Sequence, residues 1–231
     1  MRLLPVLAAF ALLAAGVHAR ADTVTLANIA PAVVDEVRKS GLVNAAIPVR
    51  GFVWTIEHRR PFRQPRTIIE DIAGSADGAS SAHSRATLPD GKVEYSDYVS
   101  VRGLLKVGPA DEKLGISASG LTVPPASGQK FRLSGERDGI VLDQVCTTRA
   151  RMPASQVHES LPGEAVAIAC EGEGKYRGMT AQVTSDVVWL AKLGVFLDRR
   201  DVFESPLGRF EFSNAVTDFK FNDSTQEGRA P

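Results

Sequence analysis

In this chain of 231 residues, the two cysteines, Cys146 and Cys170, are the residues whose type most directly suggests a defined chemistry. Two cysteines can act as a redox couple, belong to a metal site or form a structural disulfide. A thiol redox site typically has the spacing Cys-x-x-Cys, and a structural zinc site needs four closely grouped ligands. The separation of 24 positions fits neither. We therefore predict a structural disulfide between Cys146 and Cys170, as expected in an oxidising compartment.

The second feature is a basic stretch, EHRRPFRQPR, in which four arginines surround one phenylalanine. Guanidinium groups form paired hydrogen bonds with phosphate and carboxylate groups, which envelope lipids and cell-wall polymers carry. The stretch therefore predicts a binding site for an anionic group. The alternative is a solvated turn whose charges pair with Glu57, Glu70 and Asp71. The predicted binding residues are Arg59, Arg60, Arg63 and Arg66.

Three histidines beyond the N-terminal segment, His58, His83 and His158, are the remaining candidates for chemistry. The sequence contains neither His-x-x-x-His nor His-Glu-x-x-His, so we predict surface histidines, no metal and no cofactor. It also lacks the Gly-x-Ser-x-Gly and phosphate-loop patterns. Catalysis would then require a site assembled from distant residues, such as a histidine within hydrogen-bond reach of a serine and a carboxylate.

The N-terminal residues 1–21 have the pattern of a secretory signal peptide. Arg2 precedes an apolar run of fifteen residues, Leu3–Val17, which is shorter than the roughly 18 to 20 residues of a membrane-spanning helix. We predict cleavage after Ala21, or alternatively after Ala19, and a periplasmic or extracellular location. No later stretch is long enough to cross a bilayer. Without residues 1–21 the net charge would be about −2, which argues against nucleic-acid binding.

Apolar and polar residues alternate along most of the chain, which is typical of β-strands. We predict a mainly β (α+β) fold, a curved antiparallel sheet or partly open barrel of about 8–10 strands with one or two packing helices. Residues 22–221 form this single domain, and residues 222–231 form a flexible tail. The glycine- and serine-rich stretch Gly74–Ala86 is predicted to be a mobile loop.

Two segments have features of helices rather than strands. Pro31 suits a first helical position, and Gly41 suits the residue after a helix end. Ser185 suits an N-cap and Gly194 a C-terminal position, with a broad apolar face between them. We predict a helix over each segment, the second lying across the sheet.

Residues Met152–Gly163, between the two cysteines, are too many for a tight turn. We predict a long loop there with one or two helical turns after Pro153. Cys146 and Cys170 would lie on the strands before and after this loop, so that the disulfide fixes the register of those strands at the base of the loop.

Five apolar residues near the end of the chain fall into two alternation groups. The first three share one parity and the last two share the other, so a β-bulge near Thr217–Asp218 is needed to bring all five onto one face. The phenylalanines of this region are predicted to be core residues, with a lining for an apolar ligand as the alternative. The five residues are Phe210, Phe212, Val216, Phe219 and Phe221.

These features favour a non-enzymatic envelope protein outside the cytoplasm. It would bind an apolar or anionic ligand, or a protein partner, through the curved sheet, the arginine-rich turn or the loop beside the disulfide. Two alternatives are a hydrolase with a noncontiguous active site and an assembly factor that pairs with a partner through an exposed strand edge.

Overall fold

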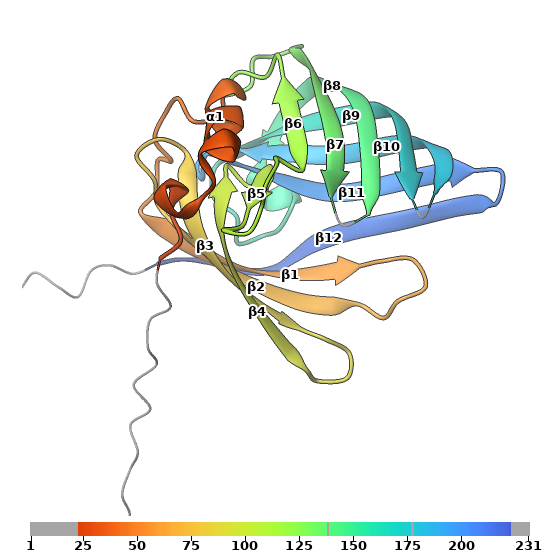
Figure 1. Ribbon diagram of the computed structural model, residues 1–231, viewed down its shortest axis with the longest axis horizontal. Coiled ribbons are helices and arrows are strands. Elements are labelled where there is room, and N and C mark those ends of the chain that lie inside the picture. Colours follow the sequence, from red (N-terminus) through yellow and green to blue (C-terminus); the bar gives the residue numbers. More distant parts are fainter. Residues whose placement is uncertain (1–22, 138, 177, 223–231) are drawn as a thin grey trace, which may run out of the picture.

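The computed structural model describes residues 23–222 apart from 138 and 177 (Figure 1). The predicted signal peptide, residues 1–21, lies outside this range, and so does the predicted tail after Asn222. Asn222 itself is held in place. Its backbone N–H donates to the Gly51 carbonyl at 3.1 Å, and its side-chain amide donates to Asp71 at 2.8 Å.

Twelve strands form one antiparallel sheet that is curved and nearly closed, as the alternating pattern predicts (Figure 1). The strand order is β5-β4-β3-β2-β1-β12-β11-β10-β9-β8-β7-β6. The strands are β1 (Gly51–Arg59), β2 (Arg66–Ala73), β3 (Ala79–Thr87), β4 (Val93–Val101), β5 (Leu105–Val107), β6 (Ile116–Ser119), β7 (Lys130–Arg137), β8 (Ile140–Pro153), β9 (Glu164–Tyr176), β10 (Met179–Leu190), β11 (Val195–Ser205) and β12 (Gly208–Phe221).

The sheet consists of two runs of consecutive hairpins, β1 to β5 and β6 to β12. The first strand of one run joins the last strand of the other, since β1 pairs with β12 from Phe52 opposite Phe221 to Arg59 opposite Ser213. Figure 1 shows the resulting two walls, with β1 and β12 where they meet. The loops that follow β1, β3, β7, β9 and β11 therefore all lie at one end of the sheet, which we call the hairpin end.

Helix α1 (Pro31–Lys39) packs against both edge strands, β5 and β6. Its buried residues Val33, Val34 and Val37 share one core cluster with residues of both strands, and Figure 1 shows the helix beside them. The predicted helix is confirmed, with Pro31 at its start and Gly41 at a φ of 74° after its end. Short 3₁₀ turns occur at η1 (Leu26–Asn28) and η2 (Ala154–Gln156).

The second predicted helix is wrong, because residues 185–190 belong to strand β10. From Val187 to Leu190, β10 is buried on both faces. Val187 and Trp189 pack into one core cluster, and Val188 and Leu190 pack into another. A strand buried on both sides shows a continuous apolar run instead of alternation, which on sequence grounds resembles a broad helix face.

The predicted mobile loop Gly74–Ala86 is also wrong, because most of it forms β3, a strand paired on both sides. Alanine and serine have weak strand preference, so the sequence gives little local signal. Pairing with β2 and β4 decides the conformation. This extra strand, and the division of residues 93–107 into the two strands β4 and β5, raise the number of strands to twelve, above the predicted range.

Cys146 and Cys170 form the predicted disulfide and lie directly opposite each other on β8 and β9. The bond therefore joins neighbouring strands of one sheet, as predicted. It does not lie at the base of the loop, because pairing continues as far as Pro153 opposite Glu164. The excursion is thus shorter than predicted and contains η2 after Pro153.

The predicted β-bulge is confirmed at Thr217. Thr55 of β1 lies opposite Asp218, and the next residue, Ile56, lies opposite Val216, so Thr217 has no opposite residue. The bulge changes the parity of the strand, and Val216 and Phe219 both enter one core cluster. Of the phenylalanines predicted to be core residues near the end of the chain, Phe196, Phe203, Phe212 and Phe219 are buried and Phe210 is half-buried. The prediction is wrong for Phe221, which is 42% exposed at the end of the strand.

Candidate functional site

Polar side chains cross the concave wall formed by β5, β4, β2, β1, β12 and β11. The register places Trp54 opposite Glu70, His58 opposite both Arg66 and Asn214, and Ser100 opposite Lys106. Residues opposite each other on antiparallel strands point to the same face, so these side chains come together even though they are far apart in the sequence.

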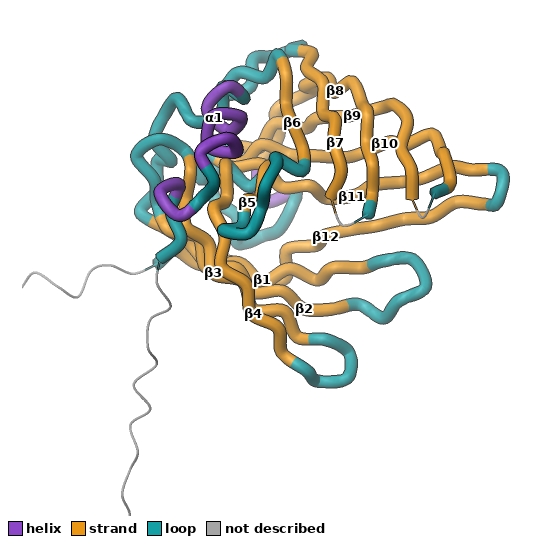
Figure 2. Tube along the Cα trace, viewed as in Figure 1, coloured by secondary structure: helices purple, strands orange, loops and turns teal. Residues whose placement is uncertain are grey.

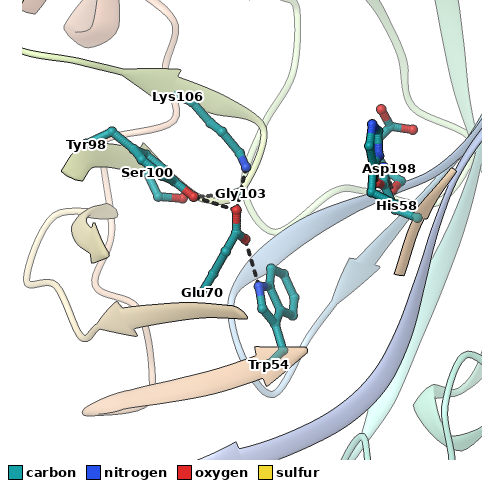
Figure 3. Close-up of polar contacts among 9 residues, drawn as sticks. Trp54, His58, Glu70, Tyr98, Ser100, Gly103, Lys106 and Asp198 are labelled. Carbon is teal, nitrogen blue, oxygen red and sulfur yellow. Dashed lines mark hydrogen bonds and ion pairs between the residues drawn. The ribbon is translucent and has the colours of Figure 1, made fainter. Parts of the chain in front are cut away.

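Glu70 lies at the centre of this wall, with only 3% of its surface exposed (Figure 3). Its carboxylate accepts hydrogen bonds from the Trp54 indole N–H at 2.8 Å, the Tyr98 hydroxyl at 2.6 Å and the Lys106 ammonium at 2.6 Å. The Lys106 nitrogen also lies 5.0 Å from the centroid of the Tyr98 ring. Three strands besides β2 therefore supply donors to one buried carboxylate.

The electrostatics of this cluster fix its protonation states. Burial alone would raise the pKa of Glu70, but the charge of Lys106 and the three hydrogen bonds outweigh it and lower that pKa below the usual glutamate value. Burial, together with the neighbouring Glu70 charge, raises the pKa of the Tyr98 hydroxyl well above its usual value. Glu70 thus stays ionised and Tyr98 stays a donor, so the cluster is a fixed ion pair and not a proton-transfer pair.

A second hydrogen-bond chain connects the arginine-rich turn to this wall. Arg60 Nε donates to His58 Nε2 at 2.8 Å. His58 Nε2 is therefore the acceptor, and the proton lies on Nδ1, 2.6 Å from Asn214 Oδ1. The Asn214 amide in turn donates to the Asp198 carbonyl at 2.9 Å. The chain fixes the Arg60 side chain against the interior of the protein.

Three adjoining hollows follow the polar wall towards the hairpin end. The innermost, of about 120 Å³, shares Arg66, Glu70 and Lys106 with a second hollow of about 350 Å³ beside β3 and β4. It shares His58 and Arg66 with a third, of about 490 Å³. We call this third one the arginine hollow. Its lining is His58, Arg60, Phe62, Arg63, Gln64, Arg66, Leu88, Pro89 and Asp90.

The structure brings three of the four predicted binding arginines, Arg60, Arg63 and Arg66, to the arginine hollow. Arg59 does not line it. Its side chain is 63% exposed, and its Nε lies 2.6 Å from the Glu57 carboxylate. Arg59 therefore has the surroundings that the solvated-turn alternative describes, whereas Arg60, Arg63 and Arg66 line the hollow that the binding-site prediction requires.

Sequence reasoning missed the cluster around Glu70. Its members come from four strands, and Lys106 is 36 positions from Glu70. One signal was present: Glu70 has the same parity as Ile68 and Ile72 in β2, so a charged residue occupies a position on the concave face. A carboxylate at such a position requires a buried partner.

The histidines contact different elements. His83 Nδ1 lies 2.6 Å from Asp97 on the neighbouring strand, and His158 Nδ1 lies 2.7 Å from the Ser160 hydroxyl. A catalytic triad needs a carboxylate and a serine beside the same histidine. Here Asp97 contacts His83, whereas Ser160 contacts His158. Within residues 23–222, leaving aside 138 and 177, no group of three or more histidines, cysteines or carboxylates could hold a metal ion.

One strand edge is relevant to the assembly alternative. The edge strand β5 covers β4 only from Val99 to Val101. Across the described part of the chain, no strand pairs with the outer edge of β4 from Val93 to Tyr98. This edge is the one that a partner strand would need.

No protein-family model matches the sequence, and no curated protein matches it significantly. Two solved structures resemble it with 77% of this chain covered. One is described as an exported protein with a YmcC-like fold from Bacteroides fragilis (TM-score 0.41, 8% identity, 99% of that chain covered). The other is described as a lipoprotein from Parabacteroides distasonis (TM-score 0.35, 7% identity, 100% covered). Similarity at this level supports no conclusion about family or function. Of the helices that the structure describes, none has the length and apolar character needed to cross a bilayer.

Proposed function

We propose that the protein is an exported, non-enzymatic envelope protein that binds an anionic ligand in the arginine hollow. The N-terminal pattern predicts export, and the disulfide between Cys146 and Cys170 suits an oxidising compartment. The observation that carries the proposal is the convergence of Arg60, Arg63 and Arg66 on one hollow.

The charges around the hollow favour an anion. Three guanidinium groups line it, against a single carboxylate, Asp90. Its volume of about 490 Å³ falls within the roughly 300–1,000 Å³ typical of small-molecule sites. Phe62 and Leu88 add apolar surface, so the anionic group can belong to a ligand with an apolar part.

The polar wall supports the hollow instead of competing with it. Glu70 is a buried carboxylate in the adjoining hollow, and Lys106 neutralises it at 2.6 Å. The hydrogen bond to His58 orients Arg60 before a ligand arrives, which reduces the side-chain entropy lost on binding. Arg66 lines the arginine hollow and the two hollows that adjoin it, so a ligand longer than its anionic group could extend inwards.

Binding of glycerol phosphate, followed by calorimetry or by NMR shifts, tests this proposal. We expect Arg63→Ala and Arg60→Ala each to weaken binding about tenfold, because each removes a charge-assisted hydrogen bond of about 1.4 kcal/mol. Native mass spectrometry of protein from its own host should show a co-purified anionic ligand that both variants lose.

Arg59→Ala is the matched control, since Arg59 belongs to the same turn but pairs with Glu57 outside the hollow. We expect this variant to bind like the wild type. Equal affinities in all four proteins, or equal losses in all three variants, would contradict a site in the arginine hollow.

A further inference from the structure

Among the residues that the structure describes, the two most exposed large apolar side chains are Phe62, with 80% of its surface exposed, and Leu207, with 75%. Phe62 lies in the loop between β1 and β2, and Leu207 lies in the turn between β11 and β12. Both loops are at the hairpin end, and Figure 2 shows them on the same side of the view. Isolated exposed apolar residues are ordinary, but two at adjacent hairpin tips form a surface feature.

Phe62 and Leu207 lie along one edge of the molecule. The Phe62 ring centroid is 5.6 Å from that of Phe210 on β12. Leu207 precedes Phe210 by three residues in the same hairpin, which corresponds to about 10 Å along the strand. We call this edge, with Phe62, Leu207 and Phe210, the apolar rim.

The backbone presents Phe62 outwards. Phe62 has a φ of 58°, in the left-handed region that bulky residues rarely adopt. Burial does not compensate for this conformation, because the ring remains largely exposed. Strained residues of this kind are concentrated at functional sites.

Basic side chains flank the apolar rim. Arg63 lies next to Phe62 and lines the arginine hollow, as Phe62 itself does. Arg59 is 63% exposed, and on the second hairpin Arg209 is 58% exposed, with Glu204 at 3.7 Å. Exposed apolar groups beside arginines complement the surface of an anionic bilayer, where lipid phosphates lie just above the acyl chains.

We propose that the hairpin end docks on a bilayer containing anionic phospholipid. A lipid headgroup phosphate occupies the arginine hollow, and Phe62 and Leu207 enter the boundary between headgroups and acyl chains. This inference rests on the proposed function and names the source of the anion. The headgroup phosphate lies against the guanidinium groups that line the hollow, and the acyl region covers the two apolar tips.

Co-sedimentation with vesicles tests the proposal. The full mature chain is mixed with vesicles of phosphatidylglycerol and phosphatidylcholine in equal parts, or of phosphatidylcholine alone. We expect binding to the anionic vesicles only, and weaker binding as sodium chloride increases. Phe62→Ser and Leu207→Ser should each weaken vesicle binding about tenfold.

Val145→Ser is the matched control, because Val145 is 53% exposed on strand β8 and is not part of the apolar rim. It should bind vesicles like the wild type. Circular dichroism and thermal unfolding confirm that each variant is folded before it is compared.

The outcomes separate this inference from the proposed function. Loss of vesicle binding in both serine variants supports docking on the bilayer if Leu207→Ser, whose residue does not line the arginine hollow, still binds glycerol phosphate like the wild type. Glycerol phosphate binding without vesicle binding, or vesicle binding that both serine variants retain, overturns the docking and leaves the arginine hollow as an anion site. If Arg60→Ala and Arg63→Ala change neither glycerol phosphate binding nor vesicle binding, the proposed function is contradicted, and with it the docking inference that rests on it.

Discussion

Glu70 is a buried carboxylate whose ionised form depends on its neighbours. Its pKa is lowered although burial opposes this, so the interactions with Lys106, Tyr98 and Trp54 are stronger in sum than the desolvation of the carboxylate. Lys106 is the only cation among these three, and its side chain is 41% exposed. The stability of the concave wall should therefore depend on this lysine and on pH.

Lys106→Met should reduce the free energy of unfolding by about 2–3 kcal/mol at neutral pH. This is less than for a fully buried pair, because water already reaches Lys106. In the wild type the lowered pKa of Glu70 contributes stability above the unfolded-state pKa, and this contribution disappears as the pH falls through the folded-state pKa. Without Lys106, burial should raise the pKa of Glu70, so the variant loses stability as the pH rises.

Urea denaturation at several pH values measures this effect. The difference between wild type and Lys106→Met should shrink as the solution is acidified. Lys92→Met is the control, since Lys92 pairs with Glu94 at 3.0 Å on the surface and should show little change. A difference that stays constant with pH would show that Glu70 does not respond to Lys106.

From the sequence alone, residues could be grouped into a candidate site where they lie close together in the chain or where their chemistry allows few roles. The arginine-rich turn is visible because its members lie within eight positions, and in the structure three of its four arginines line one hollow. The cysteines are visible because their chemistry allows few roles. The partners of Glu70 are not visible, because strand register alone brings Lys106 to it.

Strand β12 shows how a single residue can set the orientation of a whole element. Thr217 is exposed and has no opposite residue on β1, yet its presence determines which face carries the residues after it. Because side chains alternate along a strand, one extra residue reverses the face of every later side chain. Phe219 is 8% exposed and contacts Phe52 at 5.8 Å between ring centroids, a contact that depends on this reversal.

Deletion of Thr217 should therefore turn Phe219 away from the core. We expect a loss of about 3–5 kcal/mol in the free energy of unfolding, similar to removal of a buried phenylalanine. Thr217→Ala keeps the bulge and loses only the 3.3 Å hydrogen bond to the Thr55 carbonyl, so it should cost about 1 kcal/mol or less. Thermal unfolding measures the stability of both variants. Equal stability of the deletion variant and Thr217→Ala would mean that the bulge moves along the strand at little cost.

The alternation of apolar and polar residues predicted this bulge correctly. Where that alternation is missing, in β10, the sequence led to the wrongly predicted helix. In β12 the two parity groups stand out because polar residues separate them. In β10 both faces are buried from Val187 onwards, so no alternation is left to distinguish a strand from a helix. In β3 the small residues carry almost no preference, and only the neighbouring strands decide.

Across the whole molecule, contacts at the end opposite the hairpin end hold the two walls together. The turn after β4 meets the start of β11, where the Phe196 N–H donates to the Arg102 carbonyl at 2.7 Å. The Arg102 guanidinium is 1% exposed and donates to the carbonyls of Leu42, Ala45 and Gly194. One side chain thus connects the N-terminal segment, the first wall and the second wall.

Arg102→Lys should cost about 2–4 kcal/mol, because an ammonium group cannot reproduce the planar fork that reaches three carbonyls. Chemical denaturation measures the loss. Arg132→Lys serves as the control, since Arg132 forms its paired contact with Asp143 on the surface and should tolerate the change. Comparable losses in both variants would mean that the buried position of Arg102 does not matter.

The pairing of β1 with β12 has a consequence for the order in which the molecule matures. His58 and Asn214 face each other across this pair although 156 positions separate them. Each run of hairpins can form from local contacts, whereas closure of a connection this long is slow. The residues that line the arginine hollow all belong to the first run, so the hollow can form before β12 pairs with β1. The hydrogen bond between His58 and Asn214, which steadies Arg60 through His58, is completed only when the final strand joins the sheet.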